Sequence, residues 1–418
     1  MTGRQLVHDD RPRVVILGGG FAGVAAAREL GNTHALVTLV DQHAYSTFQP
    51  LLYQVATGGL NPGDVIYPLR SLTSRSGNSN LVRGRVDGVD TGAKKVTLDD
   101  GRVLDYDYLI LATGATTNYF GVPGAKENSF PLYTRADALK LRDHTFDALE
   151  RAVAANPRPD CLRVVVVGGG ATGVEMAGAL AELRQAEGTA FPELDSTRTS
   201  VVLIEQGPDL LTAFVPKLRK YARKQLLRRS VEVRTGTAVK EVRTDGVVLG
   251  DDTFLEADVV IWAAGVATSS NLLDWGMPRG RGGRVLVDAN LEVEGLPGVY
   301  ATGDVSIAGD GGEQLPQLAP AAIQTGKHAA VQIRRELIGA PKLPFKYKDK
   351  GTMATIGRRA AVADIAHGPR LTGTIAWLAW LGLHVVLLLG GRNRFATLVN
   401  LAARYAAWPG SMNPIIGD

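Results

Sequence analysis

Short apolar runs and helical stretches alternate along most of the chain. Residues 13–40 read as an apolar run, a helical pattern and a second apolar run, and residues 163–204 repeat that order with a longer connection before the last run. Strands that alternate with helices in this way form parallel sheets with helices packed on their faces. Residues 371–389 differ, because they form one stretch of nineteen residues without a charged side chain. The pattern predicts an α/β protein with two similar strand–helix–strand units and an apolar C-terminal segment.

A glycine-rich turn separates the first apolar run from its helix. Gly18, Gly20 and Gly23 have the spacing GxGxxG, and Asp41 ends the next apolar run. In such a turn the first glycine permits the tight bend, the second lets backbone approach a pyrophosphate, and the third lets the helix pack on the strand. The helix N-terminus offers N–H groups to phosphates, and Asp41 can accept hydrogen bonds from ribose hydroxyls. The segment predicts a dinucleotide-binding site.

The second unit carries the same spacing at Gly168, Gly170 and Gly173, and its acid is Glu205. Glu205 follows Gly168 by 37 residues, because the connection is longer, and no Lys or Arg comes between Glu205 and Lys217. The segment therefore offers no basic side chain that could bind the 2′-phosphate of NADPH, which favours NADH as the ligand. Both copies keep three glycines and an acid, which argues against the alternative that one copy no longer binds a nucleotide. Two such motifs predict two Rossmann-like domains, for a bound flavin and a visiting nicotinamide.

Further segments accompany the two glycine turns. The most specific is TFQPLLYQVATG at 47–58. LATG lies at 111–114, WAAG at 262–265 and YATGDV at 300–305. With these segments the chain resembles flavoproteins with two dinucleotide-binding domains, in which the four-residue segments are turns of the ATG type and YATGDV is a second flavin motif. In particular it resembles the type II NADH dehydrogenases, the single-subunit NADH:quinone oxidoreductases of respiratory membranes. The resemblance covers about residues 12–410.

The resemblance implies a bound FAD, NADH as the reductant, and a quinone such as menaquinone or ubiquinone as the acceptor. The cofactor-binding residues that it carries over are Gly18, Gly20, Phe21, Ala22, Gly23, Asp41, Gln49, Thr57, Gly58, Thr113, Gly114, Gly168, Gly170, Thr172, Gly173, Glu205, Gly265, Gly303, Asp304 and Ala319. Asp304 is expected to hold the ribityl chain of FAD, and Thr57 and Gly58 to lie near its ring system.

Two residues are expected to take part in the reaction itself. By the resemblance, Glu175 lies close to the nicotinamide and the flavin, and Gln324 lies at the quinone; either residue could position the acceptor or relay protons. From the residues alone, Glu175 could instead be an exposed acid in the first turn of a helix, favoured by the helix dipole. No protein nucleophile is expected, because the cofactor carries the chemistry, and no metal-ligand spacing is present.

The resemblance also implies how the chain is divided. Residues 12–120 and 286–340 are expected to form the FAD domain, and residues 121–285 an inserted NADH domain. Residues 341–418 would form a C-terminal region with membrane-associated helices. A homodimer is expected.

Charge and apolar pattern together point to a membrane surface. The formal net charge is +4, yet residues 341–418 hold ten Lys and Arg against three Asp, so the rest of the chain is mildly acidic. The basic residues flank the apolar stretch 371–389 and an amphipathic stretch at 395–408. This combination favours an anionic membrane over nucleic acid as the partner. A solvated basic face is the alternative.

Three interpretations of the apolar segment remain open: a transmembrane anchor, a monotopic platform lying in the interface, and a core or dimer helix. Thr, Gly and His residues within 371–389 make it a modest spanning segment, and the family is monotopic, so the platform is favoured. Trp377, Trp380 and Trp408 would then lie at headgroup level. The N-terminus has no apolar signal sequence, so we expect the protein on the cytoplasmic face of the membrane.

One departure from the family leaves the acceptor open. Where the family has A-Q-x-A-x-Q, this chain reads APAAIQ at 319–324, so Pro320 replaces a glutamine. Proline suits the first turn of a helix, but an amide that could bind a quinone carbonyl is lost. An NAD(P)H-dependent flavoprotein reductase with another acceptor, for example in secondary metabolism, is therefore the alternative, and a non-catalytic NADH sensor is a third.

The single cysteine narrows the choice further. Cys161 cannot form an internal disulfide, an iron–sulfur cluster or a zinc site by itself. It also stands away from the flavin segments, which counts against a thiol-disulfide reductase and against a sulfide:quinone oxidoreductase. No proton channel is evident, so we expect no proton pumping.

Overall fold

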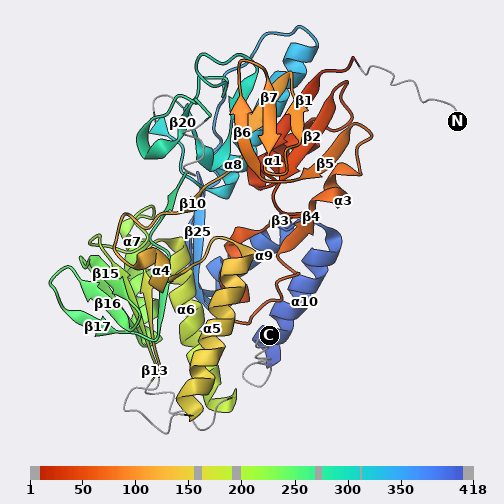
Figure 1. Ribbon diagram of the computed structural model, residues 1–418. Coiled ribbons are helices and arrows are strands. Elements are labelled where there is room, and N and C mark those ends of the chain that lie inside the picture. Colours follow the sequence, from red (N-terminus) through yellow and green to blue (C-terminus); the bar gives the residue numbers. More distant parts are fainter. Residues whose placement is uncertain (1–9, 155–161, 191–198, 269–274, 311–312, 408–418) are drawn as a thin grey trace, which may run out of the picture. The chain divides into compact units, whose positions relative to one another are not determined.

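A computed structural model describes residues 10–154, 162–190, 199–268, 275–310 and 313–407 (Figure 1). The chain forms two compact units. The first comprises Met1–Ser46, Tyr67–Thr116 and Ala267–Asp349, and the second comprises Thr47–Ile66, Thr117–Val266 and Lys350–Asp418. Cys161 and Trp408 lie outside the described residues.

The first unit is built on a parallel sheet with the strand order β21-β9-β1-β2-β5. Its main strands are β1 (Arg13–Leu17), β2 (Leu36–Asp41), β5 (Ser79–Arg83), β6 (Val86–Asp90), β7 (Lys95–Leu98), β8 (Val103–Asp105), β9 (Tyr108–Leu111), β20 (Val285–Leu286), β21 (Val299–Ala301) and β22 (Ser306–Ile307). Its main helices are α1 (Phe21–Glu29), α3 (Leu69–Thr73) and α8 (Ala319–Leu337). The expected strand–helix–strand unit at 13–40 is confirmed as β1, α1 and β2.

Helices α1 and α8 of the first unit pack with their backbones in close contact. A Cβ placed on Gly326 of α8 would lie 2.1 Å from the carbonyl oxygen of Ala22 in α1. Only a residue without a side chain allows this approach. The contact fixes the start of α1 against α8.

The second unit repeats the plan, with a parallel sheet in the order β11-β18-β12-β13-β14. Its strands include β11 (Phe130–Pro131), β12 (Leu162–Val167), β13 (Thr199–Glu205), β14 (Val231–Thr235), β15 (Val239–Arg243), β16 (Gly246–Leu249), β17 (Phe254–Glu256) and β18 (Val259–Trp262). Its helices up to residue 228 include α2 (Leu52–Ala56), α4 (Ala125–Asn128), α5 (Arg135–Ala154), α6 (Ala171–Ala190) and α7 (Pro216–Arg228). The antiparallel strands β15–β17 cover one face of the parallel sheet through a shared apolar core.

The C-terminal region belongs to the second unit. It forms an antiparallel sheet of β25 (Thr352–Gly357), β26 (Ala360–Asp364) and β27 (Arg370–Thr372), followed by α9 (Gly373–Leu387) and α10 (Gly391–Ala407). Strand β25 lies directly on α6, since a Cβ on Gly178 would be 2.3 Å from the carbonyl oxygen of Ile356. Among the described residues no helix has the length and apolar composition that crossing a bilayer requires.

The expected placement of the tryptophans at headgroup level is wrong for the two that are described. Trp377 is 8% exposed and Trp380 is 1% exposed. Trp377 packs edge-on against Tyr405 of α10, with ring centroids 4.9 Å apart, and Trp380 stacks on His384 at 4.0 Å. His384 belongs to α9 as well, and the contact of Trp380 outside its own helix is with Tyr53 of α2, with ring centroids 6.1 Å apart. The two indoles thus hold α9 to α10 and α2, while other apolar side chains of α9 are exposed.

The close contact of α1 and α8 can be tested with Gly326→Ala. We expect the added methyl group to push the helices apart and to lower the free energy of unfolding by about 1–3 kcal/mol, as overpacking does. Gly382→Ala in α9 is the control, because a Cβ there would meet no atom within 4 Å and alanine favours a helix. Urea unfolding of both variants measures the difference, and equal stability would contradict the account.

Candidate functional site

The first glycine turn leaves one open side between two tightly packed glycines. Gly18 has φ +106°, and a Cβ on it would lie 2.3 Å from the carbonyl oxygen of Ala112. A Cβ on Gly23 would lie 1.8 Å from the carbonyl oxygen of Gly18, whereas one on Gly20 would meet nothing within 4 Å. Helix α1 starts after Gly20 without a side-chain cap. The open space beside Gly20, at the start of α1, therefore suits a phosphate group.

Asp41 closes this turn. One carboxylate oxygen accepts a hydrogen bond of 2.6 Å from the Gly19 N–H, and the other accepts one of 2.6 Å from the His43 N–H. Burial raises the pKa of Asp41, and these two hydrogen bonds oppose the rise. Each oxygen keeps a second lone pair, so the expected contact with a ribose hydroxyl stays a prediction beside the observed contact with the turn.

The second turn has the same construction. Gly168 has φ +115°, and a Cβ on it would lie 2.5 Å from the carbonyl oxygen of Ala263. A Cβ on Gly173 would lie 1.8 Å from the carbonyl oxygen of Gly168, whereas one on Gly170 would meet nothing within 4 Å. Glu205 accepts hydrogen bonds of 2.6 Å from the N–H groups of residues 169 and 207. Thr172 lies exposed in the first turn of α6. The two segments predicted from spacing are thus equivalent in geometry.

The turns that follow β9 and β18 lie beside the two glycine turns. The backbone of residues 112–113 passes beside Gly18, and the backbone of residues 263–264 passes beside Gly168. Gly114 and Gly265 have φ of +69° and +155°, which favour glycine. Thr113 is exposed. The sequence predicted these turns from the ATG pattern.

The second flavin motif lies between α1 and α8 of the first unit. A Cβ on Gly303, which has φ +70°, would lie 3.2 Å from the Cβ of Ala22 and 3.4 Å from that of Ala322. The Gly303 N–H donates to Thr325 Oγ1 at 2.9 Å. Helix α8 begins at Ala319 without a side-chain cap. The expected helix start is confirmed, and its N–H groups are available beside the motif.

Asp304 has a cationic neighbour that the sequence did not reveal. Burial raises the pKa of Asp304, and the Arg284 guanidinium opposes the rise. Arg284 immediately precedes β20, which pairs with β22 next to the motif. Its Nε is buried and makes no hydrogen bond within the described chain. A flavin nucleotide, with hydroxyl and phosphate groups, fits a cradle lined by such polar groups.

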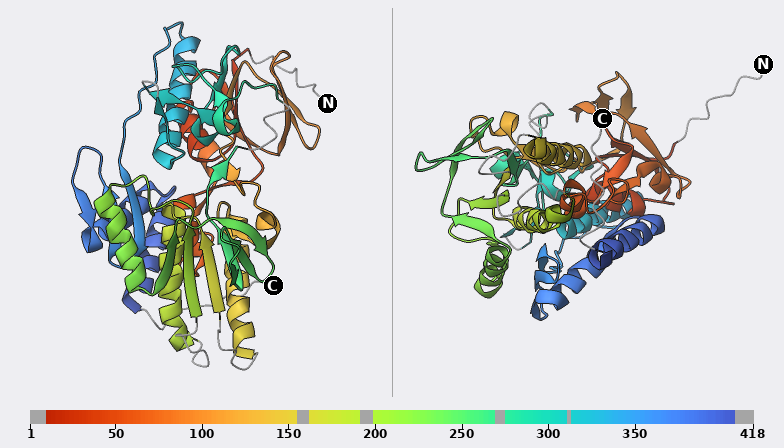
Figure 2. Two further views of the ribbon diagram at one scale, coloured as in Figure 1. Left: turned by 90° about the vertical axis from the view of Figure 1, so that its left-hand side faces the viewer. Right: turned by 90° about the horizontal axis from the view of Figure 1, so that it is seen from below.

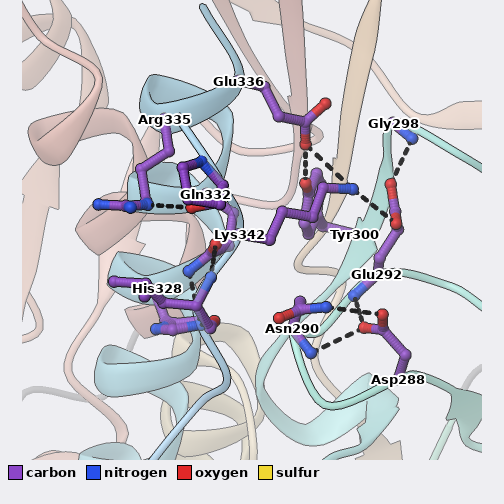
Figure 3. A network of polar contacts seen from close by, with 12 residues as sticks. Asp288, Asn290, Glu292, Gly298, Tyr300, His328, Gln332, Arg335, Glu336 and Lys342 are labelled. Atoms are coloured by element: carbon purple, nitrogen blue, oxygen red, sulfur yellow. Dashed lines mark hydrogen bonds and ion pairs between the residues drawn. The ribbon is translucent and has the colours of Figure 1, made fainter. Parts of the chain in front are cut away.

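A polar network anchors β21, which leads into this motif (Figure 3). The Tyr300 hydroxyl donates to Glu336, and Lys342 Nζ lies 2.7 Å from Glu292 and 3.2 Å from Glu336. Glu292 also accepts from the Gly298 N–H at 2.7 Å. Burial raises the pKa of Tyr300, and Glu336 raises it further. Tyr300 is part of the motif identified from the sequence, but its contacts were not predicted, because the residues of the network lie up to fifty positions apart in the chain.

The flavin-like segment 47–58 lies in the second unit. Gln49 Oε1 is buried without a hydrogen-bond partner in the described part of the chain, so it can accept one from a ligand. Thr57 Oγ1 donates to the carbonyl oxygen of Tyr53 at 2.9 Å, and Gly58 has φ +68°. Thr57 therefore caps its own helix, and its contact with a flavin stays a prediction.

Glu175 is buried in α6, so its interpretation as an exposed first-turn acid is wrong. Its relative exposure is 9%, and Oε1 accepts a hydrogen bond of 3.3 Å from the Thr355 N–H of β25. Burial raises its pKa to about 8, and the Thr355 contact opposes the rise. At neutral pH the carboxyl group therefore holds a proton that it can donate.

The side-chain amide of Gln324 is hydrogen-bonded at both ends to the backbone of Lys348. Its Nε2 donates to the carbonyl oxygen of Lys348 at 2.9 Å, and its Oε1 accepts from the Lys348 N–H at 2.9 Å. Gln317, the other amide nearby, donates to the carbonyl oxygen of Asp304 at 3.2 Å. Pro320 occupies the first turn of α8, as expected. Because both ends of the Gln324 amide are occupied, its expected role at the quinone stays a prediction.

The predicted residues fall into two groups. The first unit holds the first glycine turn, the second flavin motif and Gln324. The second unit holds the second glycine turn, Glu175 and segment 47–58. Within the described residues no group of three or more His, Cys, Asp or Glu side chains could hold a metal ion.

The raised pKa of Glu175 has a consequence for stability. The folded state binds this proton more tightly than the unfolded state, so the stabilising effect is complete below the ordinary pKa and is lost as pH rises towards about 8. Glu175→Gln does not titrate. We expect it to gain stability over the natural protein by a few kcal/mol between about pH 5 and pH 9, at about 1.4 kcal/mol per pKa unit.

Urea unfolding across that pH range measures the difference. Glu150→Gln, at an exposed position of α5, is the control and should show no such trend. A constant difference between Glu175→Gln and the natural protein would contradict a buried, proton-holding carboxyl group.

Comparisons with known proteins agree with this geometry. A family model described as pyridine nucleotide-disulphide oxidoreductase matches residues 12–326. Among solved structures, that of NDH2 from Plasmodium falciparum in complex with NADH has a TM-score of 0.88 at 22% identity, covering 97% of this chain and all of that chain. A sulfide:quinone oxidoreductase from Aquifex aeolicus has a TM-score of 0.74 at 19% identity over 94% of each chain. At these identities the likeness establishes the fold.

Curated relatives establish the family. The type II NADH:quinone oxidoreductase Ndh of Mycobacterium tuberculosis is 37% identical over 411 residues, covering 93% of this chain and 87% of the relative. The type II NADH:quinone oxidoreductase of Staphylococcus haemolyticus is 32% identical over 380 residues, covering 87% and 92%. The chain therefore belongs to the type II NADH:quinone oxidoreductase family.

Proposed function

We propose that this protein is an FAD-dependent NADH:quinone oxidoreductase. It oxidises NADH by hydride transfer and passes two electrons to a membrane quinone, such as menaquinone or ubiquinone, without pumping protons. The observation that carries the proposal is the pair of equivalent glycine turns, each closed by an acid that accepts a backbone hydrogen bond of 2.6 Å. Two nucleotides that exchange electrons need two such sites.

The residues of each turn have distinct tasks in this proposal. The first turn, with Asp304 and the start of α8 at Ala319, holds FAD, which supplies the hydride acceptor and two-electron donor. The second turn, with Thr172 and Gly265, holds NADH. The starts of α1 and α6 bind the phosphates, and Asp41 and Glu205 fix the turns that orient them. Binding in a fixed orientation lowers the barrier by removing rotational and translational freedom beforehand.

Glu175 is proposed as the proton donor for quinone reduction. A quinone takes up protons when it accepts two electrons, and a buried carboxyl group with a pKa of about 8 holds one at neutral pH. The Thr355 N–H fixes the position of its Oε1. Gln324 would help to position the quinone indirectly, by holding the backbone at Lys348.

The acceptor is proposed to be reached at a membrane surface. Helices α9 and α10 expose large apolar side chains, and two of them, Ile375 and Phe395, are 67% and 70% exposed. The others are Leu378, Leu383, Val386, Leu387, Leu398 and Val399. Apolar patches of this kind mark interaction sites, and a monotopic contact with the cytoplasmic face of an anionic membrane fits them. The expected homodimer stays a prediction.

One observation favours a second candidate, a flavoprotein reductase with a different acceptor. Pro320 removes one amide from the expected quinone-binding motif, and the amide of Gln324 is occupied by Lys348. The exposed apolar face of the C-terminal helices argues for the quinone, because a water-soluble acceptor needs no such surface.

Stopped-flow absorbance of the purified protein tests the proposal. NADH should bleach the flavin rapidly, and a menaquinone analogue should then restore the oxidised spectrum rapidly. Rapid bleaching with reoxidation that does not respond to quinone would favour the second candidate. Slow bleaching with a long-lived complex would contradict both and indicate a sensor.

Gly170→Val is the matched control for this experiment. A Cβ at this position meets no protein atom within 4 Å, so the fold should tolerate it, while the side chain fills the space proposed for the NADH pyrophosphate. We expect normal flavin content and a loss of bleaching at low NADH concentration. Gly20→Val should instead lower the flavin content, because it fills the equivalent space in the first turn.

A further inference from the structure

Helix α7 carries an uncompensated strip of positive charge. Its sequence, PKLRKYARKQLLR, contains six Lys and Arg and no acid, and its buried face consists of Leu218, Ala222 and Leu226. Lys217, Lys220, Lys224 and Arg228 are exposed. In the described part of the chain none of these four takes part in an ion pair, whereas Arg219 contacts Asp209 at 3.4 Å. A strip of this kind attracts anions, but charge alone does not identify the partner.

The position of α7 in the second unit supplies the second observation. Tyr221 of α7 lies against the first residue of α9, its hydroxyl oxygen 3.6 Å from the Cβ position of Gly373. Both helices also pack on β26, and Figure 2 shows α7, in green, beside the blue C-terminal elements in both views. The cations of α7 therefore border the start of α9, where Ile375 and Leu378 are 67% and 56% exposed.

The helical spacing puts the cations on the side of this contact. Lys217, Tyr221, Lys224 and Arg228 follow one another at intervals of four, three and four residues, which places them on one face of a helix. Burial raises the pKa of Tyr221, and the charges of Arg229 and Arg228 oppose the rise. Exposed cations thus stand next to exposed apolar side chains, which is the arrangement of interfacial membrane-binding surfaces.

We propose that α7 is the electrostatic part of the membrane-docking surface, and that its exposed cations bind anionic phospholipid headgroups beside the apolar face of α9. The proposal rests on the membrane association proposed above and deepens it by naming the helix and the cations that would bind the headgroups. Nucleic acids and acidic proteins would match the charge but leave the adjoining apolar side chains in water. A bilayer with anionic headgroups matches both features.

The test is binding of the full-length holoprotein to sedimentable vesicles. One set contains phosphatidylcholine alone, and the other contains phosphatidylcholine with phosphatidylglycerol. We expect the natural protein to prefer the anionic vesicles, and the triple variant Lys217→Gln, Lys224→Gln, Arg228→Gln to lose affinity for them by about tenfold or more, since each Lys or Arg near an anionic surface contributes measurably. Its affinity for neutral vesicles, its flavin content and its NADH oxidation with ferricyanide should stay unchanged.

A variant with the same loss of charge provides the control. Lys126→Gln, Lys240→Gln and Arg243→Gln change exposed residues of α4 and β15, which belong to the β15–β17 side of the parallel sheet. This control should bind anionic vesicles like the natural protein. If both triple variants lose affinity equally, only net charge matters and the proposal is overturned.

Three further outcomes are distinguishable. If the α7 variant keeps full preference for phosphatidylglycerol, the proposal fails while membrane association stands. If the natural protein binds neither kind of vesicle, membrane association fails as well. If the natural protein binds a DNA or RNA oligonucleotide through the α7 cations as tightly as it binds anionic vesicles, the strip serves another partner and the proposal is overturned.

Discussion

Helices α1 and α6 each begin directly over the end of the preceding strand, β1 or β12, because two glycines in each turn carry no side chain. At Gly23 and Gly173 a Cβ would come within 1.8 Å of a carbonyl oxygen of the same turn. This close packing places the starts of α1 and α6 beside Gly20 and Gly170, where a Cβ would meet no atom within 4 Å. Phosphate binding, and with it the whole proposed chemistry, depends on that arrangement.

The acids at the ends of β2 and β13 add a second constraint. Asp41 and Glu205 each accept the N–H of the glycine that follows the first glycine in the turn, at 2.6 Å. A nucleotide that binds either acid would therefore also act on the shape of the turn. Aspartate and glutamate differ in length, yet both turns contain the same hydrogen bond from the backbone to the acid. The two turns therefore share a geometry that neither the glycine spacing nor the charge of the acid alone specifies.

The sequence was sufficient to predict features that depend on neighbouring positions. Glycine spacing and apolar runs predicted both turns. The family resemblance implied a helix start near Ala319, and Pro320 is compatible with the first turn of that helix. Features that depend on distant contacts could not be predicted. Segment 47–66 and the chain from residue 350 onward pack in the second unit, and nothing in their composition indicates that partner. The backbone pairing of Gln324 with Lys348 is hidden in the sequence for the same reason.

The C-terminal region joins two tasks within the second unit. Strand β25 supplies the Thr355 N–H that fixes the buried Glu175, and helices α9 and α10 supply the exposed apolar face. Trp377 and Trp380 link α9 to the rest of the unit, because Trp377 packs in a core with Ala361 and Ala363 of β26 and Trp380 lies beside Tyr53 of α2. An acid held in its neutral form at neutral pH and a surface suited to a membrane thus depend on the same stretch of chain.

A count of bound nucleotides tests whether each chain holds two of them, one at each glycine turn. The protein is purified, denatured, and its released nucleotides are quantified by chromatography, while equilibrium dialysis measures NAD⁺ binding to the native holoprotein. We expect one FAD released per chain and one further nicotinamide nucleotide bound per chain. A protein that carries no flavin even after incubation with FAD, or a holoprotein that binds no nicotinamide nucleotide, would contradict it.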